Sequence, residues 1–145
     1  MGRFQQSPNT EHWQCLKRIV RYLRSTGQMV LEFTRNKNAP RVVGYADSDW
    51  AADAVDRKSI SGFIFKVFGC TVSWSSKKQT TVATSSSEAE YVALSSASAE
   101  AIWLNGLLDD IHITSEAPTV IFEDNRGCIG LAKNLETKRS KHIIL

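Results

Sequence analysis

The sequence predicts an α/β fold, in which three antiparallel strands and a parallel fourth form one mixed sheet with helices packed on it. One observation is a tight hairpin at Gly69, because strands joined so closely must be antiparallel. Another is a long helical segment before the last strand, which allows a crossover onto the sheet. The order of three strands, helix, strand and helix is typical of an α/β layer. With 145 residues and 42% hydrophobic content, the chain can build one compact core.

The first part of the chain is predicted to form a helix over residues 9–25 and a short strand over residues 28–34. Asn9 or Thr10 can cap the helix. Its apolar stripe at helical spacing consists of Trp13, Leu16, Val20 and Leu23. The other faces carry Lys17, Arg18, Arg21 and Arg24, which either are solvated or contact phosphate. Residues 36–40 indicate a linker.

Three strands are predicted over residues 41–47, 59–68 and 70–76. Apolar residues alternate along the second, and Gly69 indicates a hairpin turn into the third. Residues 48–58 are polar and are expected to form a turn.

The second half of the chain is predicted to form a helix over residues 86–110, broken near Asn105 and Gly106. A strand over residues 119–124 follows, and then a short helix over residues 125–133. The intervening helix favours a parallel pairing of this last strand with the first.

Composition narrows the class of protein. The net charge of +3 and the pI of about 8.8 are compatible with a polyanionic partner but do not demand one. The three cysteines are far apart, which argues against a zinc site or a disulfide framework. No signal peptide or membrane-spanning run is present. We therefore expect a soluble, intracellular protein without a membrane partner.

Three carboxylates form the candidate site. Asp47 and Asp124 each continue one face of a strand and lie where the strand ends, the place where α/β sheets present ligands. Glu90 lies on the apolar stripe of the long helix, where a glutamate needs a partner or a metal. That stripe consists of Ala93, Leu94, Ala97, Ala101, Leu104 and Leu108. Glu88 has a capping role instead, because Ser85 lies three residues before it.

Three carboxylates in one place are typical of a pair of hard cations. Each aspartate also has a structural interpretation, since aspartates at strand ends are often turn formers, and Asp124 could cap the following helix. Asp49 would share the face of Asp47 if the strand ran two residues further, but we expect it in the polar turn.

A polar loop predicted over residues 77–84 begins with Lys77, Lys78 and Gln79. This loop either grips a backbone phosphate or is solvated. The serines that follow it have no histidine in a plausible base position, which argues against a serine hydrolase.

Several stretches then occur in a specific order: GYADSDWA (44–51), SISGF (59–63), VSWSSKKQ (72–79), SSEAEYVAL (86–94), EDN (123–125) and RSKHI (139–143). In this order they resemble the ribonuclease H domain of copia-type retrotransposon Pol polyproteins. Residues 1–34 resemble the segment that joins reverse transcriptase to ribonuclease H. The resemblance covers nearly the whole chain and implies a ribonuclease H-like fold.

The resemblance implies that Asp47, Glu90 and Asp124 are catalytic and hold two Mg²⁺ (or Mn²⁺) ions, which hydrolyse the RNA strand of an RNA–DNA hybrid. The implied partners are that hybrid and the reverse transcriptase of a parent polyprotein, in a cytoplasmic virus-like particle or the nucleus. The candidate nucleic-acid-binding residues are Lys77, Lys78, Gln79, Asn125 and Arg126.

The resemblance also sets the expected domain organisation: a connection segment over residues 1–38, an incomplete ribonuclease H-like core over 39–134 and a basic tail over 135–145. The family's last strand, last helix and fourth acid are expected to be missing, and Ile144 stands where relatives have an acid. We therefore expect weak or no cleavage. The alternative is a catalytically dead genomic remnant that acts at most as a nucleic-acid-binding module.

Overall fold

The computed structural model describes residues 2–34, 36 and 38–134. The chain divides into two compact units, Met1–Glu32 and Phe33–Leu145. The tail predicted over residues 135–145, including Ile144, lies outside the described residues.

The first unit consists of a short 3₁₀ turn, η1 (Gly2–Phe4), and the helix α1 (Thr10–Ser25), which confirms the predicted helix. Asn9 caps α1: its side-chain oxygen accepts from the backbone amide of His12 at 2.9 Å, while His12 Nδ1 accepts from the amide of Asn9 at 3.1 Å. The His12 ring also stacks on Phe4, with ring centroids 4.3 Å apart.

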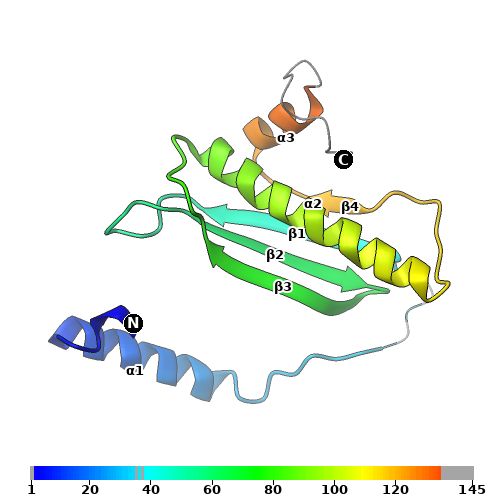
Figure 1. The fold of residues 1–145 in the computed structure, drawn as a ribbon. Coiled ribbons are helices and arrows are strands. Elements are labelled where there is room, and N and C mark those ends of the chain that lie inside the picture. The colour runs from blue at the N-terminus through cyan, green and yellow to red at the C-terminus, as the bar shows by residue number, and fades with distance from the viewer. Residues whose placement is uncertain (1, 35, 37, 135–145) are drawn as a thin grey trace. The chain divides into compact units, whose positions relative to one another are not determined.

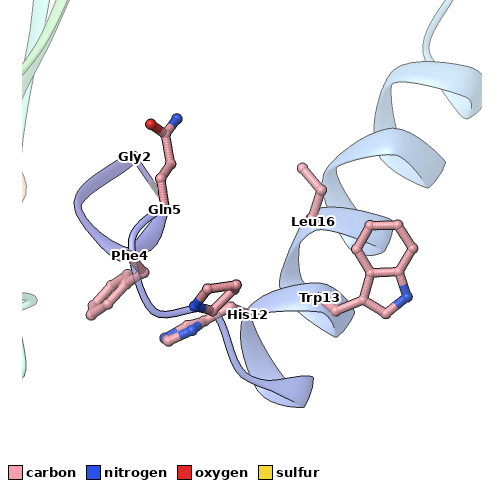
Figure 2. Close-up of a pocket in the computed structure, with 7 residues that line it drawn as sticks. Gly2, Phe4, Gln5, His12, Trp13 and Leu16 are labelled. Atoms are coloured by element: carbon pink, nitrogen blue, oxygen red, sulfur yellow. The ribbon is translucent and has the colours of Figure 1, made fainter.

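A cavity of about 220 Å³ lies between the turn and the start of α1 (Figure 2). It is lined by Gly2, Phe4, Gln5, Pro8, His12, Trp13 and Leu16. The predicted apolar stripe of α1 is 42–62% exposed, so the described residues of the first unit do not bury it.

The short strand predicted over residues 28–34 is wrong. Residues 26–28 form a turn and residues 29–34 have no regular structure. A strand is stabilised by hydrogen bonds to a neighbour. None of the strands within the described residues pairs with this segment.

The second unit is a four-stranded sheet in the order β3-β2-β1-β4, with α2 lying across one face (Figure 1). The elements are β1 (Val42–Asp49), β2 (Ile60–Val67), β3 (Cys70–Lys78), α2 (Ser86–Asp110), β4 (Val120–Phe122) and α3 (Arg126–Lys133). β2 pairs antiparallel with β1 and β3, whereas β4 pairs parallel with β1. The predicted fold class and the predicted adjacency of the first and last strands are confirmed.

Several boundaries differ from the prediction. β4 is shorter than the predicted 119–124, because its pairing with β1 ends at Phe122, so Asp124 follows the strand. β1 continues to Asp49 because pairing with β2 extends to Ile60, and β3 continues to Lys78 for the same reason. α2 is not broken at Asn105 and Gly106. The Asn105 side chain bonds the carbonyl of Ala101 in the preceding turn, so it supports the helix instead of ending it.

The turn between β2 and β3 is the predicted hairpin. Phe68 and Gly69 form its two-residue loop and have φ values of 50° and 86°. Positive φ at both positions is typical of the turn whose twist matches antiparallel strands. Gly69 adopts this conformation without the steric cost of a side chain.

The core lies between α2 and the sheet. Val42 and Ala46 of β1 face Leu94, Ala97, Ala101, Leu104 and Leu108 of α2, and Phe65 and Cys128 are fully buried beside them. Gly44 allows this packing, because a Cβ at that position would lie 2.4 Å from the Phe65 ring. The apolar stripe predicted for the long helix is therefore its buried face.

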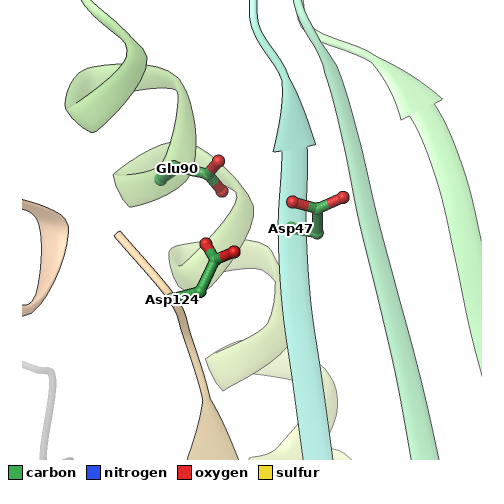
Figure 3. Close-up of side chains that lie close together, drawn as sticks. All are labelled: Asp47, Glu90 and Asp124. Carbon is green, nitrogen blue, oxygen red and sulfur yellow. The ribbon is translucent and has the colours of Figure 1, made fainter. Parts of the chain in front are cut away.

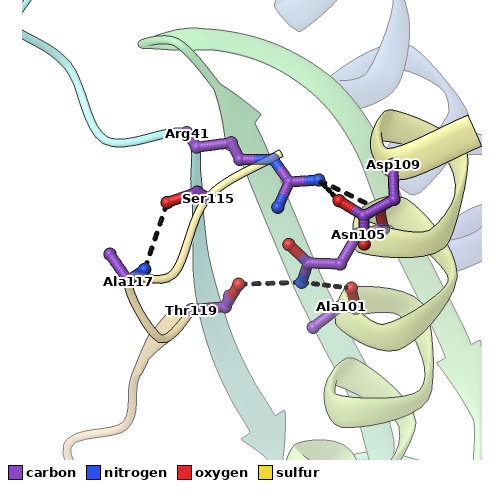
Figure 4. A network of polar contacts seen from close by, with 7 residues as sticks. All are labelled: Arg41, Ala101, Asn105, Asp109, Ser115, Ala117 and Thr119. Carbon is purple, nitrogen blue, oxygen red and sulfur yellow. Dashed lines mark hydrogen bonds and ion pairs between the residues drawn. The ribbon is translucent and has the colours of Figure 1, made fainter. Parts of the chain in front are cut away.

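A polar network ties the C-terminal half of α2 to the segments that lead into β1 and β4 (Figure 4). The Arg41 guanidinium donates to the carbonyl of Asn105 at 3.1 Å and to the carboxylate of Asp109 at 2.5 Å. The amide of Asn105 also donates to the Thr119 hydroxyl at 2.8 Å. The network holds α2 against the residues that directly precede β1 and β4.

Within the second unit, no helix of the described residues covers the other face of the sheet. One cross-strand row runs over all four strands, because Trp74 is paired with Ile64, Ile64 with Tyr45 and Tyr45 with Phe122. These four side chains are 61%, 46%, 43% and 53% exposed. The rings of Tyr45 and Phe122 stack with centroids 5.2 Å apart. Trp74, Ile64, Tyr45 and Phe122 together form the open-face row.

Candidate metal centre

Asp47, Glu90 and Asp124 converge (Figure 3). Each offers a carboxylate oxygen, and these oxygens lie within 4.8 Å of one another. Asp47 comes from β1, Glu90 from the first turns of α2 and Asp124 from the residues after β4. The three acids singled out from the sequence are thus brought to one place.

The register of the sheet explains how Glu90 of α2 can meet the two aspartates of the sheet. β4 pairs with β1 only as far as Phe122 opposite Tyr45, and the chain then leaves the sheet. Asp47 therefore pairs with Gly62 of β2 on one side and has no paired strand on the other. Glu90, from the helix on the covered face, can reach the aspartates at this end of β4.

Glu90 is the buried member of the cluster, at 6% exposure, whereas Asp47 and Asp124 are exposed. Burial, together with the nearby charges of Glu123 and Asp47, raises the pKa of Glu90 to about 7. The Glu90 Oε2 atom is buried without a hydrogen bond among the described residues, and the nearby Ser48 hydroxyl, buried and equally unpaired, acts to lower the pKa of Glu90. A carboxylate in this position is costly to ionise unless a cation compensates it.

Glu123 is a half-buried acid that the sequence did not single out, and its carboxylate is not among those that converge. Its Oε1 accepts from the backbone amide of Asn125 at 2.9 Å, but its buried Oε2 accepts no hydrogen bond among the described residues. Burial raises the pKa of Glu123, and the charges of Asp124 and Asp47 act in the same direction. The sequence offered one sign of this residue, because Glu123 directly precedes Asp124 at the end of a predicted strand.

Glu88 and Asp49 do not belong to the cluster. The Glu88 carboxylate accepts from the amide and the hydroxyl of Thr84, both at 2.6 Å, and Ser85 caps α2. The predicted capping role is confirmed, although the amide that Glu88 reaches is that of Thr84. Asp49 lies in β1 and not in the predicted turn, but its carboxylate is not among those that converge.

The five candidate nucleic-acid-binding residues have different surroundings. Lys78 lies at the end of β3, not in a loop, and pairs with Asp53 and Asp56 at 2.6 Å each. Gln79 is buried, and its amide donates to Ser61 and to the carbonyl of Ala89.

The other three candidates are more accessible. Asn125 caps α3 through the amide of Cys128 at 2.9 Å, while Lys77 and Arg126 are exposed. Lys77 and Arg126 are therefore the two members of the set that present a free cationic surface to solvent.

The donor set suits a hard divalent cation. It consists of carboxylate oxygens alone, which Mg²⁺ and Mn²⁺ favour, and contains no thiolate or imidazole of the kind that favours zinc. The orphaned Glu90 Oε2 inside the cluster is the atom that a cation would satisfy. Cys128 lies nearby, but burial, with the charges of Glu123 and Glu90, raises the pKa of its thiol to about 12.

Comparison with known proteins identifies relatives. The chain is 55% identical to the secreted RxLR effector protein 161 of Plasmopara viticola over 104 residues, which are 72% of each chain. It is 39% identical over 144 residues to the retrovirus-related Pol polyprotein from transposon TNT 1-94 of Nicotiana tabacum. It is 38% identical over 146 residues to that from transposon RE2 of Arabidopsis thaliana.

The matches to the two Pol polyproteins cover nearly all of this chain. The chain in turn spans only 11% and 10% of the length of those polyproteins. No family model and no solved structure matches the chain. Among the described residues, no helix combines the length and apolar character that crossing a membrane requires.

Proposed function

Because the chain belongs to the retrovirus-related Pol polyproteins of copia-type retrotransposons, we propose that it is a ribonuclease H-type domain. Its reaction is hydrolysis of the RNA strand of an RNA–DNA hybrid, with Mg²⁺ or Mn²⁺ as cofactor. The observation that carries this proposal is the convergence of Asp47, Glu90 and Asp124 within 4.8 Å.

In this proposal the three carboxylates hold the cations, which supply an activated water and stabilise the leaving oxygen. Glu90 is the buried ligand of the site, and its packing between α2 and the sheet restricts the position of its carboxylate. Asp47 and Asp124 are exposed and so lie on the side from which a substrate approaches. Arg126, two residues after Asp124 and exposed, and Lys77 are the cations proposed to contact backbone phosphates.

The parent context follows from the family. Residues 1–38 are proposed to connect this domain to reverse transcriptase, with residues 39–134 as the ribonuclease H-like core. The chain spans about a tenth of the Pol polyproteins. We propose that it acts on the hybrid as part of such a polyprotein, in a virus-like particle or the nucleus.

A cleavage assay with the full chain tests the proposal. The substrates are an RNA–DNA hybrid labelled on the RNA strand, the matching DNA duplex and the single-stranded RNA, each with Mg²⁺ or Mn²⁺. We expect at most weak cleavage, dependent on the metal and confined to the hybrid. Since even indirect support of a metal ligand is worth about 10–100-fold, Glu90→Gln and Asp124→Asn should each lose about 100-fold or more.

The matched control is Glu116→Gln, which makes the same chemical change at an exposed loop position outside the cluster. It should keep full activity. Hybrid binding without cleavage in the unmodified chain would favour the alternative, a nucleic-acid-binding module without turnover. Equal cleavage by Glu90→Gln and the unmodified chain would refute the assignment of the site.

A further inference from the structure

Asp124, one of the three converging acids, lies between two elements and not inside one. Pairing of β4 with β1 ends at Phe122, and α3 begins at Arg126. The hydrogen bonds of the sheet therefore stop before this carboxylate. A divalent cation is bound tightly only where its ligands keep fixed separations, and Mg²⁺ demands near-ideal geometry. The contacts of the segment that carries Asp124 thus decide how well the centre binds a cation.

One hydrogen bond joins this segment to the helix that carries Glu90. The hydroxyl of Ser87, in the first turn of α2, donates to Oδ1 of Asn125 at 3.0 Å. Ser87 lies three residues before Glu90, and Asn125 directly follows Asp124. A single side-chain bond therefore connects the residues next to two of the converging acids, which are far apart in the sequence.

The start of α3 packs closely against the same serine. A Cβ at Gly127 would lie 2.3 Å from the Ser87 hydroxyl oxygen and 3.1 Å from Asn125 Oδ1. The absence of a side chain at Gly127 therefore leaves the hydroxyl room to reach Asn125. The same Oδ1 atom accepts from the amide of Cys128 at 2.9 Å, so one oxygen joins α2 to the first turn of α3.

The N-cap of α3 explains Asn125 alone. An asparagine caps a helix with one accepted hydrogen bond, which Cys128 provides. The bond from Ser87 adds nothing to that cap, and a serine in the first turn of a helix needs no such partner, since Ser86 beside it is exposed. Glycine also disfavours a helix, and the close approach of Ser87 supplies a reason for Gly127 at the start of α3.

A separate contact holds Glu90 to the sheet. The side-chain amide of Gln79 donates to the carbonyl of Ala89 at 2.9 Å and to the hydroxyl of Ser61 in β2 at 2.8 Å. Gln79 is buried, and Ala89 directly precedes Glu90. This contact relates Glu90 to the sheet, so the position of Glu90 relative to the segment after β4 depends on the other contact, between α2 and α3.

We propose that Ser87 and Asn125 are positioning residues of the metal centre, and that their hydrogen bond sets the separation of the Glu90 and Asp124 carboxylates. Both residues act through these two ligands and do not touch the cation. Asn125, which the sequence indicated as a nucleic-acid-binding candidate, thereby acts on the centre through its neighbour. This inference rests on the proposed function, because it concerns the same centre.

Calorimetric binding of Mn²⁺ to the metal-free full chain tests the inference without any activity measurement. Ser87→Ala removes the hydroxyl and keeps the cap of α3. We expect its affinity for Mn²⁺ to fall about 10-fold, within the range for residues that orient metal ligands. Ser86→Ala, the same change at the neighbouring exposed position, should bind Mn²⁺ as the unmodified chain does.

Gly127→Ala breaks the same contact from the side of α3. Its Cβ would displace the Ser87 hydroxyl, so the affinity for Mn²⁺ should also fall, although alanine favours a helix. Gly130→Ala in the same helix, whose Cβ would meet no atom within 4 Å, should not change the affinity. Because both changes remove one contact, the double variant Ser87→Ala/Gly127→Ala should lose less affinity than the two single losses combined.

Two further measurements separate positioning from mere stabilisation of the fold. Melting without metal identifies a temperature at which every variant is folded, and the affinities are compared there. The electron paramagnetic resonance spectrum of bound Mn²⁺ reports the arrangement of its ligands. It should change in Ser87→Ala and stay unchanged in Ser86→Ala.

The outcomes distinguish this inference from the proposed function. If the unmodified chain, Ser87→Ala and Gly127→Ala bind Mn²⁺ with equal affinity, the inference is wrong, while the metal centre of the proposed function stands. If the unmodified chain binds no Mn²⁺, the proposed function fails and the inference falls with it. Weaker binding by both variants, with unchanged binding by Ser86→Ala and Gly130→Ala, supports the inference.

Discussion

At the scale of single residues, burial decides which acids are chemically unusual. Glu88 and Glu90 are two positions apart on α2, yet Glu88 is exposed and bonded to Thr84, whereas Glu90 is buried with an unpaired oxygen. The same turn of helix therefore holds one carboxylate whose pKa is lowered and one whose pKa is raised. The difference arises from which side of the helix faces the sheet.

The raised pKa of Glu90 predicts how the stability of the metal-free chain changes with pH. Between the ordinary value of 4.5 and about 7, the folded state binds more protons than the unfolded state. Stability should therefore fall as pH rises through this window, by roughly 3 kcal/mol in total. Glu123 acts in the same direction. Thermal melting in a metal chelator at pH 5 and pH 8 measures the change.

The control for this prediction is Glu90→Gln, which should melt with a clearly weaker dependence on pH. The carboxyls of Asp56 and Glu88 have lowered pKa values and ordinary values of 3.8 and 4.5, so they act below this window. An unchanged pH dependence in Glu90→Gln would show that Glu90 is not the responsible group.

Thiol chemistry provides a second test at residue scale. Cys128 is fully buried and burial raises its pKa to about 12, whereas Cys15 is exposed. Because the thiolate is the reactive form, iodoacetamide at pH 8 should modify Cys15 in the folded chain and Cys128 only after denaturation. Mass spectrometry of the modified peptides checks this. Rapid modification of Cys128 in the folded chain would contradict its burial in the core, where it packs against α2.

At the scale of elements, the packing of α2 on β1 and β2 depends on the absence of a side chain at Gly44. Residues 42 and 46 of β1 are buried beneath the helix, and the Phe65 ring of β2 occupies the space above Gly44. The close fit explains why the sheet holds the helix, and with it Glu90, at a fixed distance from Asp47.

We therefore predict that Gly44→Ala destabilises the fold. A Cβ would lie 2.4 Å from the fully buried Phe65 ring, which has no room to move. Overpacking of this kind costs about 1–3 kcal/mol. Gly130→Ala in α3 is the matched control, since its Cβ would meet no atom within 4 Å and alanine favours a helix. Urea unfolding should show a loss of stability for Gly44→Ala and none for Gly130→Ala.

At the scale of the whole molecule, α2 and α3 lie on the covered side of the sheet, and the open-face row defined above is exposed. A contiguous apolar patch on a protein surface favours association. Every strand contributes one of its residues, Trp74, Ile64, Tyr45 and Phe122, so the patch is continuous across the sheet.

We predict that the chain self-associates as its concentration rises and that Trp74→Lys weakens this association. The change places a charge at the most exposed member of the row, on the edge strand β3. Sedimentation at several concentrations measures the effect. Trp103→Lys, at an exposed α2 position with 59% exposure, is the matched control. Equal association of both variants would show that the open-face row is not responsible.

The sequence alone determined the order and type of the elements of the second unit and the face on which Glu90 lies. These follow from local periodicity: helical spacing groups Glu90 with the apolar stripe, and the spacing of Ser85 and Glu88 indicates a cap. The hairpin at Gly69 and the parallel fourth strand follow from local turn chemistry and connection length.

Only the tertiary structure decided which polar residues are free to act. Lys78 and Gln79 looked like neighbours in a phosphate-binding loop, but long-range pairing extends β3 and commits them to Asp53, Asp56, Ser61 and Ala89. Pairing with β2 likewise placed Asp49 in a strand. Residues 28–34 form no strand, because no strand of the described residues pairs with them. The burial of the Glu123 Oε2 atom is likewise not visible in the sequence. Burial and pairing are properties of contacts between distant segments, and local patterns do not contain them.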